Sequence, residues 1–383
     1  MNDPAALRAP LLSARRFVLK LGTRVLTHDD GTLALSRLFG LIESAVALRR
    51  AGKDVILVSS GAVGLGRDAL GFSATPTDVA DRQACAAVGQ TRLMALYQDG
   101  FARLGVLTGQ VLLSQSDFDD RVRCLNLRAT LTRLLRRGVI PIVNENDAVS
   151  TEELAFLDDG SSRPVFGDND KLSALVATEL AADLLILLTD VEGVFDSDPR
   201  GNPAAQLLTR IDSLQELGGA GASTSGSGRG GMRSKVSAAQ IAARSGCHAV
   251  IASGREPGVL ARSAAAEPIG TWFPAREDSL QARRRWIAYA TAPRGVLRLD
   301  AGAVEALVER GASLLAAGVK AIEGEFHDGD VVELRGPKAE LIGRGLMCFD
   351  SGAARAWCAG TPPPGIRNHD ALVHRRHLVL EPQ

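Results

Sequence analysis

The hydrophobic positions of this chain follow two alternating patterns. Short apolar runs, largely β-branched and bounded by turn residues, predict buried strands at 16–21, 54–59, 105–114, 138–144, 183–189 and 248–253. Segments with apolar residues at helical spacing predict helices at 35–51, 81–104, 121–137, 171–181 and 231–246. Strands that alternate with helices favour an α/β fold with a mainly parallel sheet. Ligands of such sheets bind at the carboxyl ends of the strands, so a functional site is expected in the strand-to-helix turns.

The pattern changes after residue 273. A polar stretch with a basic run at 283–285 follows, and beyond it short alternating segments at 295–299, 319–326 and 330–335 predict a small β-barrel-like domain. The sequence therefore predicts domains at 1–273 and 294–383, joined by a linker at 274–293. Residues 1–13 lack the basic start and apolar core of a secretory signal, and we expect them to form a short, loose leader.

Composition narrows the class of protein. The 383 residues are 45% hydrophobic and 23% charged, as in ordinary globular proteins, and the absence of an apolar run of about 20 residues predicts a cytoplasmic protein without a membrane span. Because 44 basic and 44 acidic residues are interspersed, the chain lacks the net positive charge and clustered basic residues that are typical of a dedicated nucleic-acid binder. Five cysteines without a C-x-x-C pair predict free thiols. The histidines near the C-terminus have no ligand-type neighbours at metal spacing, which favours a surface tail.

Almost all basic side chains are arginine, so two lysines in glycine-rich turns stand out. An ammonium group is a compact point charge, whereas a guanidinium group is a wide planar fork. Lys20 lies near the end of the first predicted strand and Gly22 follows that strand, so a phosphate could approach the glycine and meet the lysine. A solvated lysine at a strand end is the alternative. Lys235 lies where the Gly- and Ser-rich segment 218–235 enters a predicted helix.

Three further turns carry polar groups. In the run Gly-Asp-Asn-Asp at 167–170, one carboxylate could cap the following helix, and the remaining acceptors suggest a ligand, with local capping as the alternative. The turn Ser-Ser-Gly-Ala at 59–62 offers hydroxyl groups and backbone amides to an anion, or is a tight turn. Asn-Glu-Asn-Asp at 144–147 follows a buried strand and could bind an amino group, or is a polar loop.

The segment 218–235 ends in Gly-Gly-Met-Arg-Ser-Lys at a helix start. Glycine amides, a helix dipole and a lysine together suit a polyphosphate. The spacing is not that of a Walker A loop. Residues 226–231 match G-x-G-x-x-G, but no predicted strand precedes them, so a dinucleotide site is not indicated. A lid over a nucleotide fits this composition better than an inert linker.

The order of these turns, with Thr-Asp at 189–190 between them, resembles the amino acid kinase family over residues 16–273, most closely its glutamate 5-kinase branch. The C-terminal region resembles a PUA domain. The resemblance implies a three-layer α/β sandwich and ATP-dependent phosphorylation of the L-glutamate side-chain carboxylate to L-glutamyl 5-phosphate, the first step of proline biosynthesis. It also implies proline as feedback inhibitor, Mg²⁺ held by the ATP phosphates with no metal ligand from the protein, a homo-oligomer, and possible coupling to glutamate-5-semialdehyde dehydrogenase.

The resemblance also assigns roles to residues of this chain. The catalytic residues would be Lys20, Asp170 and Lys235, with the lysines gripping the phosphates from opposite sides and Asp170 orienting Lys20 or Lys235. The glutamate site would comprise Ser60, Gly61, Ala62, Asp147 and Asn169. The ATP site would comprise Lys20, Gly22, Thr189, Asp190, Arg229, Gly230, Gly231, Met232, Arg233, Ser234 and Lys235.

Departures from the family pattern add expectations. Arg229 and Arg233 stand where close relatives usually have uncharged residues, and we expect them to add phosphate contacts. An insertion around 154–164 is expected to alter proline sensitivity. RNA binding is disfavoured, because the C-terminal region is near neutral and has few aromatic side chains for stacking. The alternatives are a sister kinase acting on acetylglutamate, aspartate, carbamate or uridylate, and a catalytically silent RNA-binding or regulatory protein.

Overall fold

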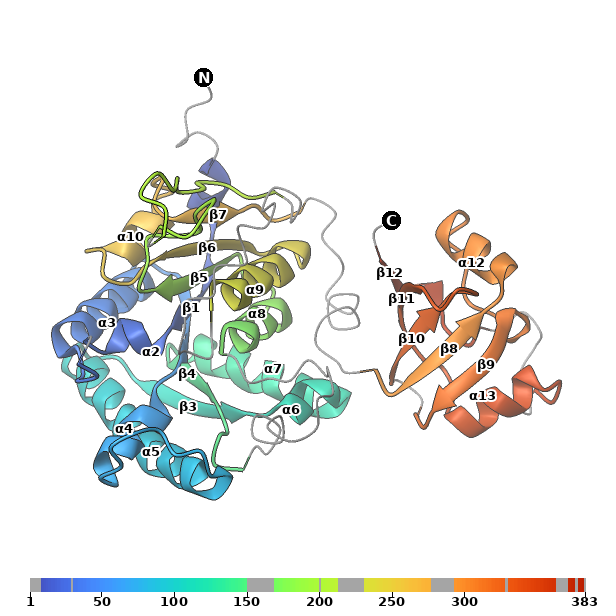
Figure 1. The fold of residues 1–383 in the computed structure, drawn as a ribbon, viewed down its shortest axis with the longest axis horizontal. Helices are drawn as coiled ribbons and strands as arrows, with labels where there is room; N and C mark the ends of the chain where they lie inside the picture. The colour runs from blue at the N-terminus through green and yellow to red at the C-terminus, as the bar shows by residue number, and fades with distance from the viewer. Residues whose placement is uncertain are drawn as a thin grey trace. The chain divides into compact units, whose positions relative to one another are not determined.

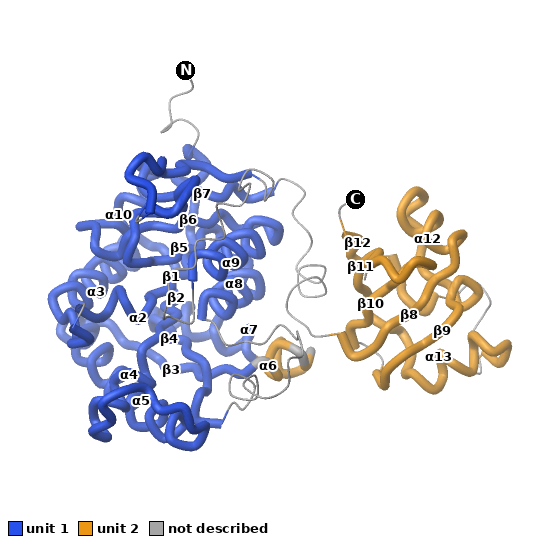
Figure 2. The backbone as a smooth tube through the Cα atoms, in the orientation of Figure 1, with its two compact units in different colours: residues 1–115, 127–279 blue, residues 116–126, 280–383 orange. Residues whose placement is uncertain are grey.

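The computed structural model describes residues 8–28, 30–149, 169–199, 201–212, 231–276, 293–327, 330–362, 371–375 and 378–381. The chain divides into two compact units, coloured separately in Figure 2. The first comprises residues 1–115 and 127–279, and the second comprises 116–126 and 280–383. Each unit has its own hydrophobic core and its own sheet.

The first unit is built on a seven-stranded sheet with the order β3-β4-β2-β1-β5-β6-β7. Neighbouring strands are parallel except for the antiparallel pair β6–β7. The strands are β1 (Arg16–Leu21), β2 (Asp54–Ser59), β3 (Thr108–Leu113), β4 (Ile140–Glu145), β5 (Leu184–Thr189), β6 (His248–Ser253) and β7 (Thr271–Phe273). The six predicted strands are confirmed. β7 was not predicted, because three residues are too few to show a periodic pattern.

Helices cover both faces of this sheet, which gives the three layers that were predicted. Figure 1 shows α2, α3, α4, α5 and α10 on one face and α7, α8 and α9 on the other. The helices between residues 23 and 264 are α2 (Thr23–Leu26), α3 (Leu35–Arg50), α4 (Ala62–Ala69), α5 (Val79–Arg103), α6 (Gln115–Asp119), α7 (Arg121–Arg136), α8 (Asn169–Glu179), α9 (Met232–Arg244) and α10 (Val259–Ala264). Most of α6 and the start of α7 belong to the second unit. Because both faces are covered, every residue of β5 is buried. None of the described helices is long and apolar enough to cross a bilayer.

The prediction of a loose leader is wrong for residues 8–13. Ala9–Ser13 form a 3₁₀ helix, and the residue before it, Arg8, is 2% exposed. Its guanidinium group donates hydrogen bonds of 2.6–3.0 Å to four backbone oxygens, those of Thr209, Glu267, Ile269 and Gly270. Burial lowers the pKa of Arg8 to about 10. The partners lie 201 to 262 residues away in the sequence, so local composition could not reveal this anchor.

The second unit contains a five-stranded sheet with the order β12-β11-β10-β8-β9. The predicted segments form β8 (Gly295–Leu299), β9 (Val319–Gly324) and β10 (Val331–Arg335), and they are joined by β11 (Leu341–Leu346) and β12 (Leu378–Leu380). Two helices were not predicted, α12 (Ala301–Val308) and α13 (Ser351–Cys358). An aspartate, which is a preferred N-cap residue, precedes each of these helices in the sequence. In the structure Asp300 and Asp350 each accept a 2.8 Å hydrogen bond from an amide of the first turn.

Candidate active site

Four of the predicted turns follow four neighbouring strands. β4, β2, β1 and β5 lie side by side and run parallel, so their carboxyl ends share one edge of the sheet. This edge gathers Asp147 after β4, Ser60 after β2, Lys20 near the end of β1 and Thr189 at the end of β5. The first turns of α8 and α9 add Asp170 and Lys235. The fold thus brings together turns that are far apart in the sequence.

Asp170 binds both lysines. Lys20 Nζ lies 2.6 Å from Asp170 Oδ1, and Lys235 Nζ lies 3.1 Å from Asp170 Oδ2. The hydroxyl of Ser234 donates to Oδ2 at 3.3 Å. Asp170 is 0% exposed, and Lys20 and Lys235 are 4% and 7% exposed. Two ammonium groups are therefore held at fixed positions beside one carboxylate, and the three side chains carry a net charge of +1.

Burial and charge act in opposite directions on Asp170. Burial on its own would raise the pKa of this carboxyl, but the neighbouring ammonium groups of Lys20 and Lys235 outweigh it and hold the pKa below the ordinary value. The carboxylate is therefore ionised at neutral pH and occupied on both oxygens. Such a group is suited to positioning cations rather than to accepting a proton from a substrate.

A chain of three side-chain amides lies beside this cluster. Asn169, the first residue of α8, donates from Nδ2 to Asn144 Oδ1 at 3.2 Å. Asn144 in turn donates from Nδ2 to Gln90 Oε1 at 2.7 Å. Asn169 Oδ1 is buried and has no hydrogen-bond partner among the described residues. Gln90 was not predicted as a site residue, because it lies in the middle of the long helix α5 and belongs to no turn or motif.

The Ser60 turn is shaped by close helix packing. Gly61 has a φ of 102°, a left-handed conformation that favours glycine, and it precedes α4. A Cβ at Gly89 of α5 would lie 1.7 Å from Ala62 O, so α5 contacts the backbone at the start of α4. Next to the turn, Ser59 shares a 2.8 Å hydrogen bond with Tyr97, and burial raises the pKa of that phenol to about 12. These contacts fix the loop that carries Ser60.

Two turns that are predicted to bind ATP lie close to cationic side chains, the turn at Thr189 and Asp190 to Arg24 and the turn at Gly22 to Lys20. Thr189 Oγ1 donates to Asp190 Oδ1 at 3.1 Å, and Arg24 Nη1 lies 3.4 Å from Asp190 Oδ2. Burial would raise the pKa of Asp190, but hydrogen bonds from its own backbone, from Thr189 and from Arg24 lower it overall. A Cβ at Gly22 would lie 3.5 Å from Lys20 Nζ, so the glycine leaves that approach to the ammonium uncovered.

Part of the predicted lid lies outside the described residues. This holds for Arg229 and Gly230, and for Asp168 and the insertion at 154–164. In the described part, Gly231 is the N-cap residue of α9, and a glycine has no side chain that could cap the first amides of that helix. Such amides are available to an anion. Met232 and Ser234 are half-buried and Arg233 is exposed.

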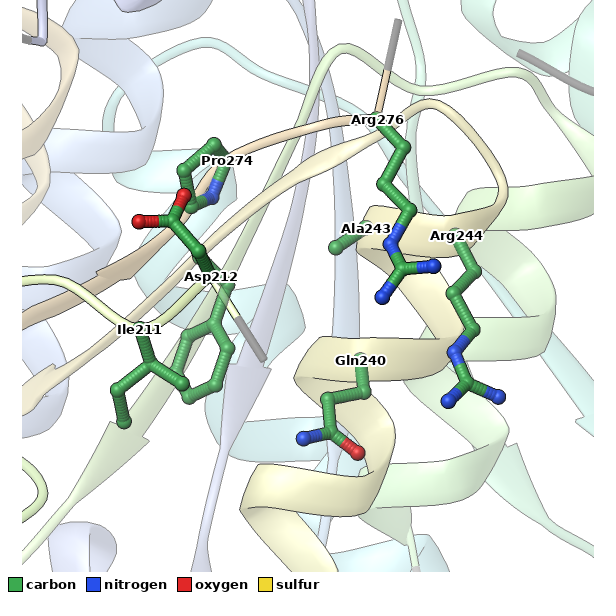
Figure 3. Close-up of a pocket in the computed structure, with 8 residues that line it drawn as sticks. Ile211, Asp212, Gln240, Ala243, Arg244, Pro274 and Arg276 are labelled. Atoms are coloured by element: carbon green, nitrogen blue, oxygen red, sulfur yellow. The ribbon is translucent and has the colours of Figure 1, made fainter. Parts of the chain in front are cut away.

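A separate cavity lies between β7 and the last turns of α9 (Figure 3). It encloses about 320 Å³ including space open to solvent, and its lining includes Gln240, Arg244 and Arg276. None of the predicted site residues lines it. Lys235 lies in the first turn of the same helix, which places the lysine cluster and this cavity at different ends of α9.

Comparison with known proteins supplies the family. The profile described as the amino acid kinase family matches residues 15–253, and the PUA domain profile matches residues 295–360. The chain belongs to the amino acid kinase family. The predicted resemblance and fold class are therefore confirmed.

Curated relatives of this amino acid kinase are named glutamate 5-kinase. The relative from Trichlorobacter lovleyi is 42% identical over 97% of this chain and 98% of its own length. The relative from Synechococcus elongatus is 45% identical over 95% and 98%, and that from Pseudomonas putida is 42% identical over 98% and 100%. Among solved structures, UMP kinase from Bacillus anthracis aligns with 68% of this chain and 96% of its own, at 16% identity and a TM-score of 0.46.

Proposed function

We propose that this amino acid kinase transfers the γ-phosphoryl group of ATP to the side-chain carboxylate of L-glutamate. The products would be ADP and L-glutamyl 5-phosphate, and the reaction would be the first step of proline biosynthesis. The name shared by relatives over nearly the whole chain supports the choice of acceptor. The observation that carries the chemistry is the buried Asp170 carboxylate that holds Lys20 and Lys235 at the carboxyl edge of the sheet.

The proposed reaction needs cations more than it needs a base. A glutamate carboxyl has a pKa of about 4.3 and is already ionised at neutral pH, so the nucleophile requires no deprotonation. The barrier is the approach of one anion to another, and phosphoryl transfer is catalysed mainly by positioning and electrostatic stabilisation. Lys20 and Lys235 would supply positive charge to the transferring group, and Asp170 would fix their positions.

The two substrates would occupy neighbouring parts of the edge. Ser60 and the backbone of Gly61 and Ala62 would bind the anionic part of glutamate, while Asp147 and Asn169 offer acceptors to its ammonium group. The ATP phosphates would contact the turn at Gly22, Thr189 and Asp190 and the lid at 229–235. Arg229 and Arg233 would add phosphate contacts.

Magnesium is proposed as the partner of the ATP phosphates. Among the described residues there is no group of three side chains suited to holding a metal, and Asp170 is occupied by two lysines. When bound, Mg²⁺ would neutralise developing charge on the phosphate oxygens.

Regulation and assembly are proposed from the family resemblance. Proline would compete near the glutamate site, and the insertion at 154–164 would change its effect. The chain would form a homo-oligomer in the cytoplasm and could couple to glutamate-5-semialdehyde dehydrogenase. We further propose that residues 1–273 form the kinase domain, 274–293 the linker and 294–383 the PUA-like domain, without an RNA partner.

One assay tests the acceptor directly. ADP release is measured with ATP and Mg²⁺ and with glutamate, aspartate, N-acetylglutamate, carbamate or UMP, and any acyl phosphate is trapped with hydroxylamine as its hydroxamate. We expect activity with glutamate that proline suppresses. Activity with another acceptor alone would leave the family assignment and refute the proposed substrate, and silence with all five would favour a regulatory protein.

A further inference from the structure

The amide chain from α5 to α8 has a defined polarity. Asn169 Nδ2 donates to Asn144, and Asn144 Nδ2 donates to Gln90, over distances of 3.2 Å and 2.7 Å. Each amide can donate in this way only if the next one presents its oxygen. Gln90 Oε1 is the last acceptor of the chain, and Gln90 Nε2 is buried without a hydrogen-bond partner among the described residues. With Gln90 turned this way, Asn144 presents its nitrogen to Gln90 and its oxygen to Asn169.

The polarity of this chain determines which atom Asn169, at its α8 end, leaves unpaired. With its nitrogen committed to Asn144, Asn169 directs its oxygen elsewhere, and that oxygen is buried without a partner among the described residues. A buried acceptor without a donor costs about 1–3 kcal/mol, so the site favours a ligand that brings donors. The α-ammonium group of an amino-acid substrate is such a ligand.

We infer that Gln90 is a positioning residue of the acceptor site, which acts through Asn144 to keep the oxygen of Asn169 available to the substrate ammonium. The inference rests on the proposed function, because it assumes an amino-acid acceptor at this edge. If Asn144 rotated, its nitrogen would face Asn169 Nδ2, and Asn169 would have to present a donor to a cation.

The surroundings of Gln90 favour a fixed position. Gly89 precedes it, and a Cβ there would lie 1.7 Å from Ala62 O, so this part of α5 is packed against the start of α4. Asn144 lies at the end of a fully buried strand and is 1% exposed. The chain of amides therefore joins three rigid elements, α5, β4 and α8, at one point beside the lysine cluster.

The test uses steady-state kinetics of the full-length protein with two substitutions at one position. Gln90→Met removes the acceptor at similar side-chain length, and we expect it to raise the KM for glutamate about tenfold. The KM for ATP and kcat should change less than about twofold, since neither depends on the ammonium contact. Gln90→Glu retains an oxygen toward Asn144, and we expect its glutamate KM to stay near that of the parent.

Two comparisons separate positioning from a general loss of structure. Gln98→Met changes an exposed glutamine of the same helix and should leave all parameters unchanged. In an Asn144→Ala background, Gln90→Met should add no further increase in KM, because Gln90 acts through Asn144.

Several outcomes would overturn the inference. These are an unchanged glutamate KM in Gln90→Met, a Gln90→Glu variant as impaired as Gln90→Met, or additive effects with Asn144→Ala. Failure of the proposed function would instead show in the parent protein, which would then be inactive with glutamate and active only with another acceptor, or inactive with all of them. The same variants are then assayed with the acceptor found active, and an effect on an acceptor that lacks an ammonium group would refute the role of Gln90.

Discussion

Asp170 shows how one carboxylate can control two cations. Removing its charge by Asp170→Asn would leave the ammonium groups of Lys20 and Lys235 facing each other in a buried site. Breaking a buried ion pair in this way costs about 3–5 kcal/mol, so we expect the free energy of unfolding to fall by that amount in urea titrations. Asp99→Asn, at an exposed helix pair, is the control and should change stability little.

The stabilisation that Asp170 contributes, measured against the same Asp170→Asn variant, depends on pH. The folded-state pKa of Asp170 lies below its ordinary value of 3.8, so its stabilising effect is complete above that pH and is lost as the pH falls through the lower folded-state value. The stability difference between the parent and Asp170→Asn should therefore be constant near neutrality and shrink below about pH 4. A difference that grows on acidification would contradict the assignment.

Lys235 is expected to act on the chemical step. Lys235→Met keeps the side-chain length and removes the charge, and it should lower kcat by about 10²–10³ if the ammonium stabilises the transferring phosphoryl group. Turnover is measured by ADP release, with melting temperature recorded to separate chemistry from folding. Lys320→Met, at an exposed lysine of the second unit, serves as the control. Parent-like turnover of Lys235→Met would remove the residue from the mechanism.

At the scale of elements, the pair α4–α5 depends on glycine for close approach. A Cβ at Gly66 would lie 1.7 Å from Cys85 O, whereas a Cβ at Gly64 of the same helix meets nothing within 4 Å. Gly66→Ala should therefore destabilise the protein by about 1–3 kcal/mol. Since α4 begins at Ala62, the glutamate KM should also rise. Gly64→Ala is the matched control and should be neutral or slightly stabilising. Equal effects of the two substitutions on melting temperature would contradict this account.

The elements also show what periodicity can predict. The six strands and five helices named from apolar spacing are present, with ends that differ by up to three residues. α4 and β7 were missed, because eight and three residues give little periodic signal. The position of α4 depends on its close packing against α5, and the local sequence of α4 does not show that contact.

At the scale of the whole molecule, two separate cores predict two unfolding events. Leu334→Ala in the core of the second unit should lower one calorimetric transition, since deleting a buried leucine side chain costs about 2–5 kcal/mol. Ile186→Ala, in the core of the first unit, should lower the other. ATP with glutamate should raise only the transition that Ile186→Ala lowers, since ligands stabilise the unit that binds them. A single transition affected equally by both variants would refute this division.

The sequence by itself determined the strand-helix alternation, the strand-to-helix turns as sites of chemistry, and the family resemblance. Apolar spacing and turn residues are local properties, so they can be seen along the chain. Only the tertiary structure decided that Asp170 holds both lysines, that Asn144 donates a hydrogen bond to Gln90, and that Arg8 anchors the N-terminal segment. These contacts join residues tens to hundreds of positions apart, and their geometry follows from the order of strands in the sheet.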